Sequence, residues 1–182
     1  ERVAELLDQQ PEIVDRPGAR DLPRVAGAVE FRNVTFGYEP GQPVLRGLNL
    51  RAEPGETVAL VGPTGAGKTS IINLLARFYE PQEGLVLVDG VDLRTVTQRS
   101  WRSQLGIVQQ DTFLFSGTIR ENIRFGRPDA SDADVEAAAR AVGLHEFITQ
   151  LERGYDTEVQ ERGAKLSVGQ RQLIAFARAL AF

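Results

Sequence analysis

The sequence predicts an α/β fold, and three features of the chain, taken in order of position, support this prediction. Alternating apolar and polar residues over 29–52 indicate strands. A glycine-rich loop over 62–69 then separates a short apolar run from a segment with helical periodicity. Beyond Gly117 the apolar residues recur at helical spacing, so a strand-rich half is followed by a helix-rich half.

The composition is that of an ordinary soluble globular protein, and it excludes several kinds of site. Of the 182 residues, 42% are hydrophobic and 25% are charged, which suits one domain or one domain with a subdomain. The 25 acidic residues outnumber the 21 basic ones, and no basic stripe indicates a nucleic acid as partner. The absence of cysteine excludes disulfides and thiolate metal sites. No apolar run approaches the ~18–20 residues that span a bilayer, so a link to a membrane requires a partner or an attached domain.

The N-terminal residues indicate a short helix followed by a linker. Val3, Leu6 and Leu7 have helical spacing, so residues 1–10 are predicted to form an amphipathic helix. Proline and glycine then interrupt residues 11–27, which we interpret as a linker. The sequence leaves open whether this linker is a frayed end or a meaningful connector.

Two strands are predicted next in the chain. Residues 29–36 predict a strand with a bulge, because the alternation of apolar residues slips by one position at Asn33. Residues 48–52 alternate in a second strand, and the turn sequence 53–56 closes it.

Two further strands are predicted from consecutive apolar residues. The runs 58–61 and 85–88 are short and wholly apolar, as expected of strands buried on both faces. The dipeptide Asp89-Gly90 follows the second run and indicates a hairpin.

The second half predicts two helices in succession. Ser131 and Asp134 form an N-terminal capping pattern, and the helix that follows is placed to end at Gly143. The same apolar spacing repeats over 144–151 and stops at Gly154.

The most specific motif is Gly-Pro-Thr-Gly-Ala-Gly-Lys-Thr over residues 62–69, which matches the phosphate-loop pattern G-x-x-x-x-G-K-[ST]. Its context is the required one, because the loop follows the run 58–61 and opens the helical segment that contains Ile71. The alternative is a glycine-rich turn with an exposed lysine, which the agreement of spacing and flanking segments disfavours.

Each residue type in this loop has a chemical reason. Glycines let the main chain wrap closely around an anion, and successive N–H groups at the helix start donate to phosphates. Lys68 is expected to reach the β- and γ-phosphates, and the Thr69 hydroxyl is expected to help hold Mg²⁺. The predicted nucleotide-binding residues here are Gly62, Thr64, Gly65, Ala66, Gly67, Lys68, Thr69 and Ser70.

A second motif, Leu-Ser-Val-Gly-Gln-Arg-Gln over 166–172, resembles the Leu-Ser-Gly-Gly-Gln signature of ATP-binding cassette (ABC) proteins, with Val168 in place of the first glycine. From the residues alone, Ser167 and Gln170 form a capping box that starts a helix. The two interpretations are compatible, because a capped helix N-terminus is also an anion site. The resemblance implies that Ser167, Gly169 and Gln170 cover the γ-phosphate of a nucleotide held by another subunit.

Two single residues also match the family. Tyr38 matches the aromatic residue that stacks on adenine, although an aromatic at a strand end is by itself more often a packing residue. Gln110 matches the Q-loop glutamine that approaches Mg²⁺ and the attacking water, with Gln109 as the alternative register. The resemblance therefore implies catalytic roles for Lys68 and Gln110, and a metal site at Thr69 and Gln110.

Two segments favour an exporter-type member of this family. Residues 157–163 resemble the loop that exporters place before the signature, with Gln160 where glycine is usual, and residues 113–123 are also similar to exporters. The resemblance covers 29–182 and implies a P-loop NTPase fold of ABC type, with an antiparallel β subdomain, an α-helical subdomain and the C-terminal part of the core missing. The expected division is a helix and linker from a transmembrane domain (1–27), the β subdomain with the partial phosphate-loop core (28–116) and the helical subdomain ending in the signature helix (117–182).

The resemblance implies an ATP-binding domain that couples binding and hydrolysis of ATP, with Mg²⁺, to export across a membrane. The expected partners are the transmembrane domain of the same transporter and a second nucleotide-binding domain, and nucleic acid is not among them. The expected location is the cytoplasmic face of the cell membrane.

The family places an apolar strand ending in Asp-Glu after the signature helix, and then a histidine, and these are expected beyond Phe182. The single histidine, His145, lies upstream of the signature and is interpreted as a helix-surface residue. The chain is therefore expected to bind ATP but hydrolyse it negligibly, whereas the longer parent protein is expected to be an ATPase. Apolar sheet surface is also expected to stay uncovered, so that the chain is marginally stable or associates.

Two other functions stay open. A soluble ABC-type ATPase in DNA repair or translation shares both motifs, but the acidic balance and the 157–163 loop disfavour it. A non-catalytic nucleotide-binding module is the second alternative. A phosphate-loop GTPase would need an Asn-Lys-x-Asp string, which the sequence lacks.

Overall fold

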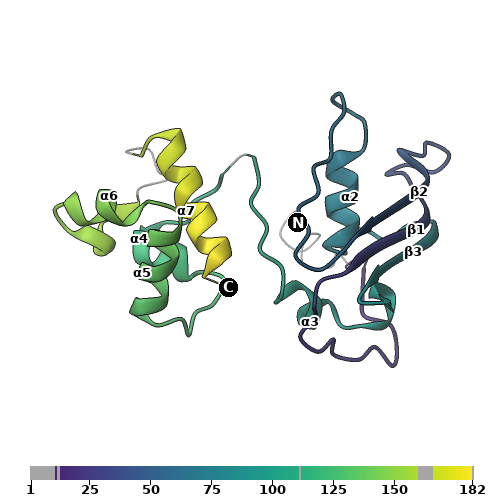
Figure 1. The fold of residues 1–182 in the computed structure, drawn as a ribbon, viewed down its shortest axis with the longest axis horizontal. Coiled ribbons are helices and arrows are strands. Elements are labelled where there is room, and N and C mark those ends of the chain that lie inside the picture. The colour runs from purple at the N-terminus through teal and green to yellow at the C-terminus, as the bar shows by residue number, and fades with distance from the viewer. Residues whose placement is uncertain (1–10, 12, 111, 160–165, 182) are drawn as a thin grey trace, which may run out of the picture. The chain divides into compact units, whose positions relative to one another are not determined.

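The computed structural model describes residues 11, 13–110, 112–159 and 166–181, which form two compact units, 1–104 and 105–182 (Figure 1). The predicted α/β class is confirmed, because a sheet dominates the first unit and helices dominate the second. The helix expected over 1–10 lies outside the described residues. The three-part division expected from the sequence remains a prediction.

The first unit is built on a four-stranded antiparallel sheet in the order β2-β1-β3-β4. Its strands are β1 (Val29–Phe36), β2 (Leu45–Ala52), β3 (Glu83–Val88) and β4 (Val91–Asp92). Helix α2 (Lys68–Leu75) lies between β2 and β3 in the sequence, and the short helices η1 (Leu93–Thr95) and α3 (Gln98–Arg102) follow β4. The buried side chains of the two central strands are Phe31, Val34, Phe36, Val86, Leu87 and Val88.

The bulge predicted in β1 is present at Asn33. The pairing of β1 with both of its neighbours shifts register around this residue. Asn33 has a left-handed φ of 49°, and its amide donates to the Asn49 side chain at 2.9 Å. Gly84 of β3 lies against the bulge, where a Cβ would come within 2.3 Å of the Asn33 carbonyl oxygen. Strand β3 therefore needs a glycine at this point.

The predicted hairpin after β3 is also confirmed, and it holds one end of the linker. Asp89 and Gly90 form the turn with left-handed φ values of 49° and 79°. The Asp89 carboxylate accepts hydrogen bonds from three successive linker amides, Ala26, Gly27 and Ala28, at 2.6, 3.1 and 2.8 Å. The end of the linker is thereby fixed beside the first residue of β1.

The middle of the linker is fixed as well. The Arg20 amide donates to the Thr95 carbonyl at 3.1 Å, and the Arg20 carbonyl accepts from the Thr97 amide at 2.9 Å. Leu22 is buried, and its amide donates to the Ser100 hydroxyl at 2.8 Å. The described part of the linker is therefore a connector with a defined course, and not a frayed end.

Arg77, which follows α2, anchors the beginning of the described linker. It is 1% exposed and has a left-handed φ of 54°. Its Nη1 donates to the Val96 carbonyl at 2.6 Å and to the Asp15 carboxylate at 3.2 Å, and its guanidinium also pairs with Glu80. Asp15 accepts a further bond from the Gln98 amide at 2.9 Å. Arg77 thus joins the linker to the end of α2 and to the start of α3.

Side chains of α3 cap the C-terminal end of α2. The Trp101 indole donates to the Leu75 carbonyl at 2.6 Å, and the Arg102 guanidinium donates to the next two carbonyls at 3.0 and 2.6 Å. These carbonyls would otherwise lack partners at the helix end. The helix ends at Leu75, and the ring of Phe78 beyond it lies under the Arg102 guanidinium, at 5.0 Å.

The prediction of a buried strand over 58–61 was wrong. These residues have no strand structure, and Val61 is 93% exposed. A strand exists only through hydrogen bonds to a neighbour, and no strand among the described residues pairs with this segment. The side chains of Val58 and Val61 consequently stay exposed.

The second unit is a helical cluster around α7 (Val168–Leu180), which packs against α4 (Ile119–Arg124) and α5 (Asp132–Ala141). Helix α6 (His145–Gln150) and the 3-10 helix η2 (Gly154–Asp156) follow α5, and the short strands β5 (Gly117–Thr118) and β6 (Glu158–Val159) pair with each other. Its fully buried residues include Ile119, Ile123, Val135, Ala139, Leu144, Ile148, Ile174 and Ala177.

The helix signals in this unit are confirmed in outline. Ser131 and Asp134 form the predicted capping box of α5, and Gly143 follows the helix with a left-handed φ of 71°. His145 lies half-buried at the start of α6, with its Nδ1 2.8 Å from the Tyr155 hydroxyl. Leu180, the last residue of α7, is exposed. Across the described parts of the chain, no helix is long and apolar enough to cross a membrane.

Candidate nucleotide-binding site

The phosphate loop of residues 62–67 requires its three glycines for two different reasons. Gly65 and Gly67 have left-handed φ values of 84° and 86°, which glycine adopts readily. A Cβ on Gly67 would also come within 2.6 Å of the Leu45 side chain, and one on Gly62 would lie 3.1 Å from the Ala66 Cβ. The loop therefore turns tightly over the beginning of β2.

Helix α2 begins without a side-chain cap. Its N-cap residue is Gly67, and its first internal bond runs from the Ile71 amide to the Gly67 carbonyl at 3.0 Å. The amides of Lys68, Thr69 and Ser70 consequently have no partner within the helix. With the positive end of the helix dipole, these donors suit a phosphate group.

Lys68 lies across the loop. Its Nζ donates to the Gly62 and Pro63 carbonyls at 2.7 and 2.8 Å, so the ammonium is held on the side of the loop that these carbonyls line. A positive charge held by loop carbonyls suits the binding of a polyphosphate. The loop and the helix start thus fit a nucleotide in both shape and charge.

The residues present also fit Mg²⁺. Thr69 is exposed at the first turn of α2, where its hydroxyl is accessible. In the described ranges, no three His, Cys, Asp or Glu side chains cluster as a metal cage. Mg²⁺ commonly keeps bound waters and is held largely by substrate phosphates, so a single hydroxyl beside the loop suits it.

Tyr38 lies beside α2 within a cluster of aromatic rings. Its ring centroid is 5.0 Å from that of Phe36 and 5.1 Å from that of Tyr79, both edge to face. Its hydroxyl is 3.1 Å from the buried Ser70 hydroxyl and accepts from the side-chain Nδ2 of Asn73 at 3.2 Å. Tyr38 is still 49% exposed, so part of its ring is open to a ligand.

Asn73 is a residue that sequence reasoning missed. It lies one helical turn after Ser70 on α2, and this spacing is the one signal that could have placed both residues beside the same partner. The structure thus brings Tyr38 together with the first turn of α2, which contains Ser70 and directly follows the phosphate loop. This half of the predicted site is contiguous within the first unit.

The signature residues lie at the start of α7 in the second unit. Ser167 and Gln170 form the predicted capping box: the Gln170 amide donates to the Ser167 hydroxyl at 3.2 Å, and the Ser167 amide donates to the Gln170 side chain at 2.8 Å. Ser167 and Gly169 are exposed, and a Cβ on Gly169 would meet no atom within 4 Å. The first turn of α7 is therefore open at its surface.

The other predicted residues of the second unit are less constrained. Gln110 is exposed in an irregular segment, and its neighbour Asp111 lies outside the described residues. Of the exporter-like loop, Glu158 and Val159 form β6, whereas residues 160–163 are not among those described. The predicted catalytic pair, Lys68 and Gln110, is thus divided between the two units.

Arg178 connects α7 to the exporter-like segment of residues 113–123, and the sequence did not reveal this connection. It donates to the Phe113 carbonyl at 3.1 Å and to the Asn122 side chain at 2.9 Å. Its guanidinium also lies over the rings of Phe115 and Phe125, which are stacked on each other at 3.9 Å. This segment and α7 therefore form one packed element.

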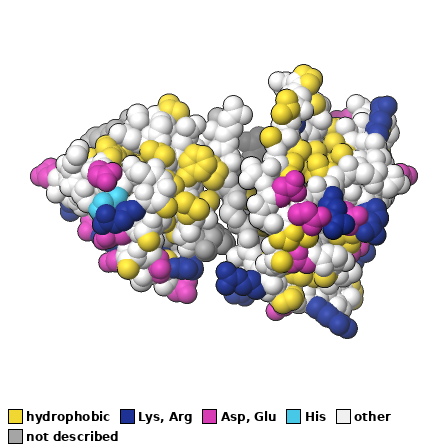
Figure 2. Space-filling model, viewed as in Figure 1, with side chains coloured by type: hydrophobic (Ala, Val, Ile, Leu, Met, Phe, Trp, Pro, Cys, Tyr) yellow, Lys and Arg dark blue, Asp and Glu magenta, His cyan; other side chains and the backbone are white. Residues whose placement is uncertain are grey.

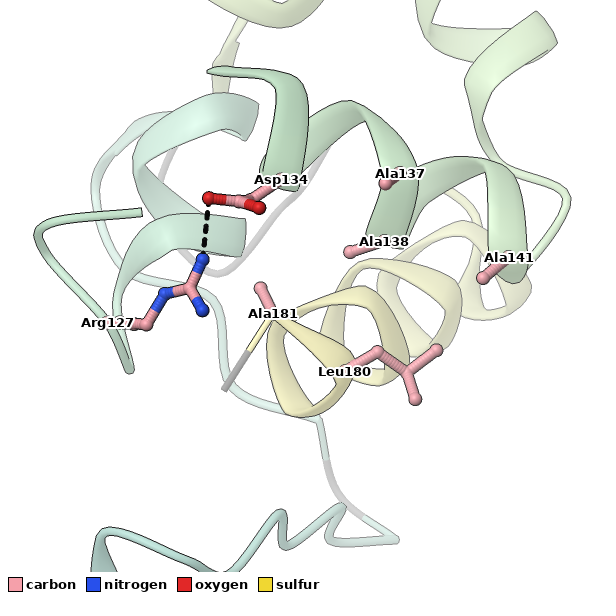
Figure 3. Close-up of a pocket in the computed structure, with 7 residues that line it drawn as sticks. All are labelled: Arg127, Asp134, Ala137, Ala138, Ala141, Leu180 and Ala181. Carbon is pink, nitrogen blue, oxygen red and sulfur yellow. Dashed lines mark ion pairs between the residues drawn. The ribbon is translucent and has the colours of Figure 1, made fainter. Parts of the chain in front are cut away.

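A separate pocket of about 300 Å³ opens in the second unit between α5 and α7 (Figure 3). Small side chains of α5 and the end of α7 line it, and the Arg127–Asp134 ion pair at 2.7 Å closes one side. It contains none of the predicted site residues. On the face shown in Figure 2, acidic and basic side chains are interspersed over both units, and no basic stripe is visible there.

Comparison with known proteins agrees with these motifs. A family model described as "ABC transporter" matches residues 45–182. The uncharacterized ABC transporter ATP-binding protein YfiC of Bacillus subtilis is 52% identical over 99% of this chain and 30% of its own length. A fatty acid ABC transporter ATP-binding/permease protein of Mycobacterium bovis is also 52% identical, over 98% of this chain and 28% of its own length.

A solved structure gives the same result for the fold. The structure of a bacterial Atm1-family ABC exporter with ATP bound matches with a TM-score of 0.94 and 48% identity, over 99% of this chain and 32% of that one. The chain spans about 30% of the length of the curated relatives that it matches. On its motifs, its fold and these similarities, the chain belongs to the ABC transporter family and has the fold of that family's nucleotide-binding domain.

Proposed function

We propose that the chain binds ATP with Mg²⁺ in its first unit and serves as the ATP-binding part of an ABC exporter. The observation that carries this proposal is the start of α2, where the first amides of an uncapped helix, two left-handed glycines and the Lys68 ammonium occur together in one short loop. The solved relative is an exporter with ATP bound, which supports the same ligand.

Within this proposal, each described residue has a separate task. The amides of Lys68, Thr69 and Ser70 and the Lys68 ammonium would hold the phosphates, and the Thr69 hydroxyl would supply one ligand to Mg²⁺. The exposed part of the Tyr38 ring stacks on adenine, since a rigid aromatic face gives contact area at little entropic cost.

The signature helix acts on a nucleotide bound elsewhere. The open first turn of α7, with Ser167, Gly169 and Gln170, covers the γ-phosphate held by a second nucleotide-binding domain. ATP then links two domains, and this closure drives the attached transmembrane domain at the cytoplasmic face of the membrane. Gln110 senses Mg²⁺ and the attacking water in the closed state.

Hydrolysis needs an oriented water and stabilised charge in addition to a phosphate cradle. A carboxylate that would polarise this water is not among the residues assigned to the site. We therefore expect the 182-residue chain to bind ATP and turn it over at least about 100-fold more slowly than the full-length protein.

The test compares these two polypeptides. Calorimetric titration of each with ATP, with and without Mg²⁺, should show saturable binding that strengthens with Mg²⁺, and phosphate release should be fast only for the full-length protein. Binding that is indifferent to Mg²⁺ would contradict the nucleotide site. Equal turnover by the two polypeptides would contradict the expectation that the 182-residue chain binds ATP but hydrolyses it slowly.

A further inference from the structure

Gln82, which precedes β3, binds both polar main-chain groups of Gly37, its amide and its carbonyl. Its Oε1 accepts from the Gly37 amide at 2.9 Å, and its Nε2 donates to the Gly37 carbonyl at 2.8 Å. The Gln82 amide donates in addition to the Thr35 carbonyl at 3.0 Å. The side chain thus acts as an extra strand residue beside the end of β1, and it continues the hydrogen bonding of the β1–β3 pair.

The residue that Gln82 holds has no side chain of its own to restrict its main-chain torsions. Residue 37 must be glycine, because a Cβ there would come within 2.3 Å of the Gln42 carbonyl oxygen. Glycine has the largest conformational freedom in the main chain. The main chain of Gln42 and Pro43 packs closely against Gly37, and a cavity of about 230 Å³ is lined by the loop 39–43, Gly37 and Gln82. The two bonds from Gln82 pair both polar main-chain groups of this glycine.

Tyr38 follows this glycine directly, so the main-chain conformation of Gly37 sets the direction in which the Tyr38 side chain leaves the chain. The far end of the ring is fixed by Ser70 and Asn73 on α2. The near end depends on Gly37, and therefore on Gln82. The ring is held at both ends with its remaining face exposed.

We propose that Gln82 is a positioning residue for adenine recognition, which acts on the base through Gly37 and Tyr38 and not by contact. The inference rests on the proposed function of Tyr38 as the adenine platform. Gln82 contributes to the affinity for the base and not to the binding of phosphates, because its contacts lie at the end of β1 and not in the phosphate loop.

The test is steady-state ATP hydrolysis by the full-length protein, with inorganic tripolyphosphate as a competitive inhibitor that lacks the base. Gln82→Ala should raise the KM for ATP about 3- to 10-fold, as expected for the loss of paired hydrogen bonds, with kcat unchanged. The inhibition constant of tripolyphosphate should stay within about 2-fold of its original value, since phosphate binding is untouched. Gln82→Glu keeps the acceptor and loses the donor, so it should raise KM as well.

Two controls isolate the mechanism. Gln42→Ala changes a glutamine of the loop 39–43. Its side chain bonds Glu39 and not the main chain of Gly37, so this variant should leave KM unchanged. In a Tyr38→Ala background, Gln82→Ala should have no further effect on KM, because the ring through which it acts is gone.

The opposite results overturn the inference. These are an unchanged KM in Gln82→Ala, an equal rise in the tripolyphosphate inhibition constant, or a full additional effect in the Tyr38→Ala background. Failure of the proposed function would be seen already in the unaltered protein, which would show no Mg²⁺-dependent hydrolysis of ATP. In that case the inference about Gln82 would fail as well.

Discussion

Two helices of this chain begin at predicted phosphate-binding sites, and they begin in opposite ways. Helix α2 starts at Gly67 with no side-chain cap, and its first amides have no partner within the helix. Helix α7 starts at Ser167 with a complete capping box, in which Gln170 supplies the reciprocal bond. Both helices begin with main-chain amides that have no partner within the helix, and only α7 supplies side-chain partners for them.

The difference separates a site that needs a ligand from a site that is finished without one. A glycine N-cap gives up a few tenths of a kcal/mol relative to a Ser or Thr cap, and a bound anion would more than offset this loss. A capped start is already stable without a ligand. In the proposed function, the phosphate loop is therefore the primary binding site, and the first turn of the signature helix is a preformed surface for the nucleotide of a second domain.

The largest effect is expected for Lys68→Ala. The ammonium is the only side-chain charge that the described loop 62–67 and the first turn of α2 contribute, so ATP turnover by the full-length protein should fall about 10²- to 10³-fold. A phosphate-release assay measures this loss. Arg46→Ala, which removes a positive charge from exposed β2, is the matched control and should keep normal turnover.

Gly67→Ala should cause the next largest change, this time in stability. The left-handed φ of 86° and the 2.6 Å approach to Leu45 together predict a loss of about 2–4 kcal/mol in the free energy of unfolding. Urea denaturation of the 182-residue chain measures it. Gly65→Ala shares the left-handed φ but has open space, so it should cost only about 1 kcal/mol. Equal losses in the two variants would show that the contact with Leu45 is unimportant.

Ser167→Ala should destabilise the chain by about 1 kcal/mol through loss of the α7 cap. Ser167→Asp keeps an oxygen acceptor at the N-cap and should restore most of that stability. Urea unfolding again provides the measurement. If the alanine variant is as stable as the original, the contrast between the two helix starts does not hold in solution.

The smallest effect is expected for Gln170→Ala. This change removes the reciprocal bond to the Ser167 amide and leaves the hydroxyl cap in place, so the loss should be about 0.5 kcal/mol. The ordering of the two α7 variants is itself informative. A larger loss for Gln170→Ala than for Ser167→Ala would place the stabilisation in the glutamine.

Local patterns predicted the parts of the fold that local physics decides. The bulge at Asn33, the Asp89-Gly90 hairpin and the capping boxes at Ser131 and Ser167 follow from neighbouring residues alone, and all are confirmed. The run 58–61 has the same apolar character as 85–88, yet only the latter finds paired strands. Periodicity shows that a segment suits a strand, but pairing depends on which other segment lies beside it.

The candidate site divides in the same way. The phosphate loop is contiguous in sequence, so its geometry was predictable, whereas Tyr38, Asn73 and Gln82 come together only through the folded sheet and α2. An isolated glutamine or asparagine carries no pattern that distinguishes a structural bond from solvent exposure. Asn73 and Gln82 could be found only once the groups that they bind, the Tyr38 hydroxyl and the Gly37 main chain, were known.

One anchor of the linker responds to acid through a single carboxyl group. Arg77 holds one end through the Val14 carbonyl at 3.4 Å and the Asp15 carboxylate at 3.2 Å. At the other end, the amides of Ala28, Ala26 and Gly27 keep the pKa of the Asp89 carboxyl below its usual value. Because the folded pKa is depressed, this fastening is complete above the unfolded pKa and is lost as pH falls through the folded one. Acid therefore releases residues 26–28 from the Asp89 turn as that carboxyl group becomes protonated.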